Sequence, residues 1–145
     1  MRKRSLFVAA FSILVVGASF KSSAAPIEQP AAYCSIKTLK GSYTYSIQGY
    51  RGGQPYASSG LFSFNGAGKV AIIYTSSIER TQLSTTGTYT VNDDCSGSMT
   101  LAATTVNNFY LSPTGDSFNF VRVSQDDVIG TEARRVSRKL MVKQP

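Results

Sequence analysis

From residue 41 onward, the chain alternates between apolar and polar positions in short runs that turn residues separate. In the first run, Tyr43, Tyr45 and Ile47 take every second position, and serine, threonine and glutamine residues lie between them. Successive side chains of a β-strand point to opposite faces, so this period of two predicts a strand with one buried face. The same pattern predicts strands over 41–50, 58–65, 69–76, 84–92, 98–104, 106–111, 117–123 and 128–142, and a weaker edge strand over 78–83.

Glycine-rich and asparagine-rich segments connect these runs. Asn65-Gly66-Ala67-Gly68 predicts a hairpin turn, because Asn and Gly tolerate positive φ, and residues 49–55 predict a flexible loop. Turn signals about every 8–12 residues, without a helical pattern after residue 24, indicate an antiparallel sandwich or barrel. Consecutive hairpins favour the barrel, because closure removes the unpaired edges of the sheet. The sequence therefore predicts an all-β antiparallel barrel of about eight or nine strands.

The first 24 residues have the three parts of a signal peptide. Met1–Arg4 is basic, residues 6–20 are largely apolar, and Ser22-Ser23-Ala24 provides small residues before a cleavage site. We expect cleavage before Ala25 and a secreted or periplasmic location. The predicted organisation is a signal peptide over 1–24, a leader with the first cysteine over 25–40, and a β-barrel domain over 41–142.

Two membrane-bound alternatives share features with this sequence. An uncleaved anchor would need roughly 20 apolar residues, and the apolar stretch over 6–20 is shorter. An outer-membrane barrel would need longer strands with an outward apolar band between aromatic girdles. Here the positions opposite the aromatic residues are mainly Ser, Thr and Asn. We therefore expect the cleaved chain not to span a membrane.

Cys34 and Cys95 are the only cysteines, and the chain contains no histidine. In an exported protein this pair predicts a structural disulfide, and closing so long a loop stabilises the fold by about 4 kcal/mol. A redox or metal role is disfavoured, because there is no CxxC motif and no histidine ligand. The absence of histidine also excludes Ser-His-Asp and Cys-His catalysis. We predict no metal and no cofactor.

The net charge of +7 comes mainly from the two ends of the chain. Four of the 15 basic residues lie in the predicted signal peptide, and five more follow Glu132 with no acidic residue among them. A nucleic-acid partner is disfavoured, because it would require a basic face interleaved with aromatic residues.

Several segments carry a resemblance to a known group of proteins. They are Tyr33-Cys34, Leu39–Tyr45, Gly60–Val70, Gly87–Gly97 and Gly130–Arg135. Together they resemble uncharacterised exported bacterial proteins with a calycin-like barrel, similar in architecture to allene oxide cyclase and the lipocalins. The resemblance implies the fold, export and the cysteine pair, but no activity and no catalytic residues.

The resemblance also implies a contact at one end of the barrel. In calycins an aromatic residue two positions after a glycine on the first strand packs beneath a basic residue from the last strand. Gly41 and Tyr43 match this pattern, with tyrosine in place of the usual tryptophan, and Arg134 or Arg135 would be the basic partner.

The inward positions of the predicted barrel supply the candidate binding residues. Aromatic side chains there serve as core, or line a cavity for an apolar ligand whose orientation the tyrosine hydroxyls fix. Arg122 follows Phe118 and Phe120 at the same alternate positions of the strand, so we expect its side chain inside the barrel or at its rim. There Glu79 or Glu132 would be its partner, or it would hold an anionic group. The candidate ligand-lining residues are Tyr43, Tyr45, Phe62, Phe64, Tyr89, Phe118, Phe120 and Arg122.

The remaining charged clusters have simpler interpretations. Asp93-Asp94 and Asp126-Asp127 are adjacent pairs, and adjacent strand residues point to opposite faces, so neither pair predicts a catalytic dyad. Both are interpreted as turn residues. The basic run over 134–139 could attract an acidic surface, but it is interpreted as a solvated strand end.

Three functional hypotheses follow. The first is a module that binds a small apolar or amphipathic molecule inside the barrel. The second is a structural or interaction protein of the envelope or exterior, with a filled barrel and function on loops such as 50–56. The third is a cyclase-type or isomerase-type enzyme, for which a buried contact between Glu79 and Arg122 beside a cavity would be expected.

Overall fold

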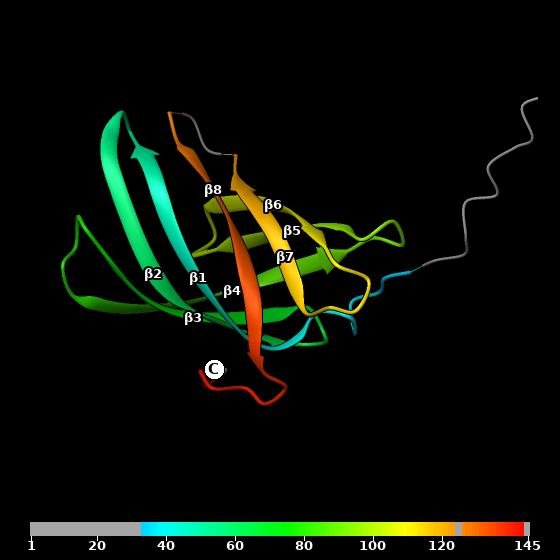
Figure 1. Ribbon diagram of the computed structural model, residues 1–145. Coiled ribbons are helices and arrows are strands. Elements are labelled where there is room, and N and C mark those ends of the chain that lie inside the picture. The colour runs from blue at the N-terminus through cyan, green and yellow to red at the C-terminus, as the bar shows by residue number, and fades with distance from the viewer. Residues whose placement is uncertain (1–32, 124–125, 144–145) are drawn as a thin grey trace, which may run out of the picture.

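The computed structural model describes residues 33–123 and 126–143, which form a closed antiparallel barrel of eight strands in chain order (Figure 1). The strands are β1 (Lys40–Arg51), β2 (Gln54–Asn65), β3 (Lys69–Ser76), β4 (Gln82–Val91), β5 (Ser96–Leu101), β6 (Thr105–Leu111), β7 (Ser117–Arg122) and β8 (Val128–Ser137). The predicted all-β antiparallel barrel is confirmed. Within the described residues there is no helix with the length and hydropathy to cross a membrane. The predicted signal peptide over 1–24 lies outside the described residues.

The alternation on β1 shows why the sheet closes around a core. Tyr43, Tyr45 and Ile47 are buried inside the barrel, whereas Thr44 and Ser46 are exposed on its outer face. β1 pairs with β2 along its full length and with β8 on its other side, which joins the first strand to the last. Each strand therefore has two hydrogen-bonded neighbours, and the sheet has no free edge.

Three predicted boundaries are wrong. Residues 78–83 do not form a separate edge strand; the hydroxyl of Ser76 accepts hydrogen bonds from the amides of Ile78 and Glu79, so the chain turns directly after β3, and β4 begins at Gln82. The predicted loop over 49–55 is only a two-residue hairpin, because Gly52 and Gly53 adopt the positive φ that such a turn requires. β5 ends at Leu101 rather than at residue 104, because the next two residues, Ala102 and Ala103, adopt positive φ and turn the chain.

The last strand also ends earlier than predicted. β8 stops at Ser137, and the chain then folds back over β1 and β2 instead of continuing as a strand to 142. The amide of Met141 donates to the hydroxyl of Ser42 at 2.9 Å, and the amide of Val142 donates to the hydroxyl of Ser63 at 3.0 Å. These two buried serines explain why the segment leaves the ladder.

The two ends of the barrel differ in construction. We call one the closed end; it holds the hairpins between β2 and β3, β4 and β5, and β6 and β7, together with residues 33–39. We call the other the open end; it holds the hairpins between β1 and β2, β3 and β4, β5 and β6, and β7 and β8. At the closed end the disulfide between Cys34 and Cys95 is confirmed, with a Cα–Cα distance of 4.9 Å. The hydroxyl of Tyr89 donates to the carbonyl of Leu39 at 2.8 Å, and Leu39 is fully buried.

Arg135 is the basic partner of Tyr43 at the closed end. Its guanidinium lies 5.4 Å from the Tyr43 ring, and its Nε donates to the Tyr43 hydroxyl at 3.1 Å. The same side chain donates to Asp116 and to the carbonyls of Thr38 and Gly115. The guanidinium thus ties the entering segment, the turn between β6 and β7, and β1 together.

Candidate ligand-binding pocket

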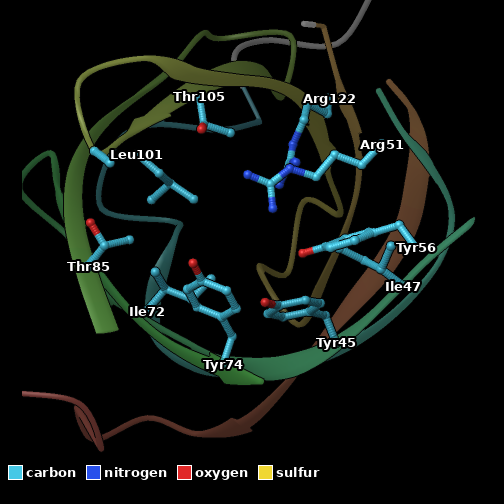
Figure 2. A pocket seen from close by; sticks show the side chains of 11 residues that line it. Tyr45, Ile47, Arg51, Tyr56, Ile72, Tyr74, Thr85, Leu101, Thr105 and Arg122 are labelled. Carbon is cyan, nitrogen blue, oxygen red and sulfur yellow. The ribbon is translucent and has the colours of Figure 1, made fainter. Parts of the chain in front are cut away.

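A cavity of about 120 Å³ opens at the open end of the barrel. Its walls come from seven of the eight strands, β1 to β7, each contributing inward-facing residues from its part nearer the open end (Figure 2). The lining residues are Tyr45, Ile47, Arg51, Tyr56, Ile72, Tyr74, Thr85, Leu101, Ala102, Thr105 and Arg122. The barrel interior is therefore hollow at this end, although it is packed below.

One wall of the cavity carries two guanidinium groups and an aromatic ring. Arg51 at the end of β1 and Arg122 at the end of β7 lie 5.6 Å and 6.0 Å from the centre of the Tyr56 ring. Figure 2 shows both guanidinium groups directed into the cavity beside this ring. Tyr56 is buried, and such cation–π contacts strengthen when water is excluded. The wall thus combines positive charge with a ring face.

Each arginine has one acidic partner. Arg122 donates from one terminal nitrogen to Asp127 at 3.4 Å, and both side chains are largely buried. Arg51 donates to Glu79 at 2.9 Å in a more exposed pair. The expected partners of Arg122, Glu79 and Glu132, are therefore wrong, because the turn between β7 and β8 brings Asp127 to it instead.

The donors of Arg122 are only partly used. Its Nε is buried and makes no hydrogen bond to any described residue. Asn107 lies directly opposite Arg122 in the β6–β7 ladder, and its buried side-chain oxygen also lacks a described partner. A buried polar group without a partner is costly, so this part of the interior retains unused hydrogen-bonding capacity.

Three tyrosines provide hydroxyl groups in or near the cavity. Burial raises the pKa of Tyr45 to about 12, and burial also raises the pKa of Tyr74. Both hydroxyls therefore remain protonated at neutral pH and can donate hydrogen bonds. The hydroxyls of Tyr56 and Tyr74 make no hydrogen bond to other described residues. In Figure 2 the Tyr45 and Tyr56 hydroxyls point toward the middle of the cavity.

The opposite wall is aliphatic. Figure 2 shows Ile72 and Leu101 across the cavity from the two arginines, with Thr85 and Thr105 beside them. Ile72 pairs with Thr85 across the β3–β4 ladder, which places these two side chains next to each other. One side of the cavity therefore carries the guanidinium groups and the hydroxyls of Tyr45 and Tyr56, and the other side carries the aliphatic side chains.

Of the eight predicted lining residues, Tyr45 and Arg122 line this cavity. The other six lie below it and pack against one another. Phe118 is central: its ring lies 5.4 Å from Tyr43, 5.9 Å from Phe62 and 5.5 Å from Phe64. The contacts with Tyr43 and Phe64 are edge-to-face, an arrangement that stabilises aromatic cores. The six packed residues are Tyr43, Phe62, Phe64, Tyr89, Phe118 and Phe120.

Sequence reasoning missed most of the other lining residues. Arg51 has the same parity on β1 as Tyr45 and Ile47, which is the signal that selected Arg122, but residues 49–55 were predicted as a loop. Tyr56 was missed for the same reason. Tyr74 shares its parity with the buried Ile72, so its position could have been found by extending the inward pattern.

The aspartate pairs lie in turns, and one has a further role. Asp94 accepts hydrogen bonds from the hydroxyl and the amide of Ser96, which lower its pKa. Asp127 accepts from Arg122 and from the amide of Gly52 at 3.1 Å, so it connects two hairpins of the open end. In the described part of the chain, no group of three acidic or cysteine side chains could hold a metal ion.

A scan against protein-family models, a search of the curated proteins and a search of the solved structures each found no match. The interpretation of the cavity therefore depends on its own geometry and chemistry.

Proposed function

We propose that the chain is an exported binding protein that holds one small amphipathic molecule in the cavity at the open end. The observation that carries this proposal is the division of the lining. Arg51, Arg122 and the hydroxyls of Tyr45 and Tyr56 lie on one side, and Ile72 and Leu101 lie on the other. Small-molecule sites typically combine an apolar lining with a few polar groups that fix orientation.

The cavity size limits the ligand. An engineered protein cavity of about 150 Å³ binds benzene, so a cavity of about 120 Å³ suits an apolar part about as large as one ring. A polar substituent on such a ring would reach the guanidinium and hydroxyl groups. Longer chains would have to extend through the open mouth into solvent.

Export is supported by the disulfide between Cys34 and Cys95, because such bonds persist in oxidising compartments. The resemblance of the sequence to exported calycin-like proteins points the same way. Expression of the full chain in a bacterial host with a periplasm tests this part. We expect the periplasmic protein to begin at Ala25 by intact mass, whereas a cytoplasmic protein of full length would contradict it.

Binding is tested by following amide resonances of the mature protein during titration with benzoate, benzyl alcohol and benzylamine. We expect at least one of these single-ring probes to shift amides around the cavity. Thr85→Phe fills the cavity from the β4 wall and should abolish the shifts. Thr86→Phe is the matched control, because its side chain lies on the outer face and should leave binding unchanged. Binding that survives Thr85→Phe would place the ligand elsewhere.

The two other hypotheses receive less support. A filled barrel would leave no cavity at the open end, yet one is present. A cyclase-type site would be favoured by a contact between Glu79 and Arg122, but these two side chains belong to separate ion pairs.

A further inference from the structure

The geometry points to a selective site for a small organic carboxylate, whose anionic group binds Arg122 and whose apolar part faces Ile72 and Leu101. This inference rests on the proposed function and gives the charge and class of the ligand. It depends on three observations: the absence of acidic residues from the cavity lining, the unused donors of Arg122, and the hydroxyl groups nearby.

The cavity presents positive charge without an opposing carboxylate in its lining. Among the described residues that line it, two are arginines and none is acidic. Glu79 and Asp127 contact the guanidinium groups, but neither belongs to the lining. Inside the cavity an anionic ligand would therefore meet the arginines with no carboxylate in the lining beside it, whereas a cationic ligand would meet two like charges.

Arg122 has the free donors that a carboxylate requires. A guanidinium carries five N–H groups, and only one hydrogen bond from Arg122 is present among the described residues. That bond is long, at 3.4 Å, and its acceptor Asp127 is shared with the amide of Gly52. The planar guanidinium binds a carboxylate through two parallel hydrogen bonds, which adds both affinity and geometric specificity.

The hydroxyl groups extend the donor set. A carboxylate has room for about four hydrogen bonds, and Tyr45 and Tyr56 can each donate one. These two tyrosines come from β1 and β2, so they approach from a different side than Arg122 on β7. The charged end of the ligand would thus be enclosed, while its ring would contact the aliphatic wall.

The test compares three probes of the same size and different charge on the mature protein. We expect benzoate to bind at least tenfold more tightly than benzyl alcohol at pH 7, and benzylamine to show no saturable binding. Titration calorimetry or amide shifts give the dissociation constants. If the alcohol or the amine binds as tightly as benzoate, the inference is wrong but the binding function stands. If none of the three binds, the proposed function fails, and this inference fails with it.

Variants locate the charge preference. Arg122→Met should remove the preference for benzoate over benzyl alcohol, and Arg122→Lys should restore part of it, because a point charge replaces the planar fork. Arg134→Met is the matched control, since Arg134 lies on the outer face in an exposed pair with Glu132. A benzoate preference that persists unchanged in folded Arg122→Met would overturn the inference. The ranking of the three probes on the unmodified protein decides it even if a variant does not fold.

Discussion

Arg122 and Arg135 are arginines on neighbouring strands at opposite ends of one barrel, and their surroundings differ. At the closed end, Arg135 donates from all three of its nitrogens, to Tyr43, Asp116 and two backbone carbonyls. At the open end, Arg122 makes one long contact with Asp127, and its buried Nε has no described partner. Every guanidinium nitrogen of Arg135 therefore donates a hydrogen bond, whereas only one nitrogen of Arg122 donates to a described residue.

We interpret the closed end as structural and the open end as the proposed binding site. Buried polar groups in stable proteins are normally hydrogen-bonded, so the closed end follows the general rule. Each exception calls for an explanation, and at the open end, where the exceptions lie beside a cavity, the explanation that we propose is a ligand that supplies the missing partner. The aromatic core centred on Phe118 lies between the two ends and packs against Tyr43, which Arg135 contacts at the closed end.

The largest expected effect comes from removing the disulfide at the closed end. Cys34 and Cys95 are 61 residues apart, so the double variant Cys34→Ala/Cys95→Ala should lower the free energy of unfolding by about 4 kcal/mol. Urea denaturation at neutral pH measures the change. Benzoate affinity should stay within about twofold where the variant is folded, because the disulfide lies at the opposite end. Loss of affinity in folded protein would show that the two ends are coupled.

The two arginines should differ in how much stability the same substitution costs. Arg135→Met removes donors from Tyr43 and two carbonyls, so we expect the free energy of unfolding to fall by about 3 kcal/mol. Arg122→Met removes one long contact and an unpaired buried donor, and Asp127 keeps the amide of Gly52 as a donor, so we expect a smaller loss, of about 1 kcal/mol. Denaturation curves of both variants under identical conditions provide the comparison. Equal losses would mean that Arg122 is a structural residue like Arg135.

Alkaline pH should weaken the fold through Tyr45, which lines the cavity. Burial raises the pKa of Tyr45 from 10.0 to about 12, so its native form stays protonated at a pH where the unfolded form ionises. The stabilisation is complete below pH 10 and is lost as the pH rises toward 12, by about 2–3 kcal/mol.

Denaturation at several pH values between 8 and 12 measures this loss. Tyr45→Phe has no group to ionise at this position and should reduce the fall. Part of the fall should remain in the variant, because burial also raises the pKa of Tyr43 and Tyr89 at the closed end and of Tyr74 in the cavity wall. An unchanged pH profile in Tyr45→Phe would assign the effect to those three residues.

The fold was predictable because alternation is a local signal that repeats along the chain. Tyr43, Tyr45 and Ile47 define the inner face of β1 without reference to any other strand. The boundaries were harder, since β3 ends through side-chain hydrogen bonds from the backbone to Ser76, and β8 ends because its continuation binds Ser42 and Ser63. These contacts depend on residues that are distant in the chain or on the geometry of a turn.

The cavity was only partly predictable, for a related reason. Inward parity selects Tyr45 and Phe62 equally, but parity does not give the height of a residue along the barrel axis. The register places Phe62 opposite Tyr43 and leaves it in the packed layer, whereas Tyr45 borders the hollow. A charged residue at an inward position indicates the cavity more specifically than an inward position alone. It identified Arg122, and it would have identified Arg51 if the predicted first strand had extended to that residue.

The smallest expected effect sharpens the role of Arg51 at the open end. Glu79 binds Arg51 at 2.9 Å and also accepts a hydrogen bond from Ser76. Glu79→Gln keeps an acceptor for Ser76 but removes the charge that competes for Arg51. Exposed ion pairs are worth about 0–1 kcal/mol, so benzoate affinity should rise by about two- to fivefold.

Calorimetric titration of Glu79→Gln with benzoate measures this gain, and Glu132→Gln is the matched control. Glu132 pairs with Arg134 on the outer face, so its neutralisation removes one negative charge without touching the cavity. A similar gain in both variants would indicate a general electrostatic effect of net charge. A gain that is confined to Glu79→Gln and disappears at high salt would show that Arg51 attracts the bound anion directly. Without the charge of Glu79, the Arg51 guanidinium would act on the anion in the cavity, and salt would screen that attraction.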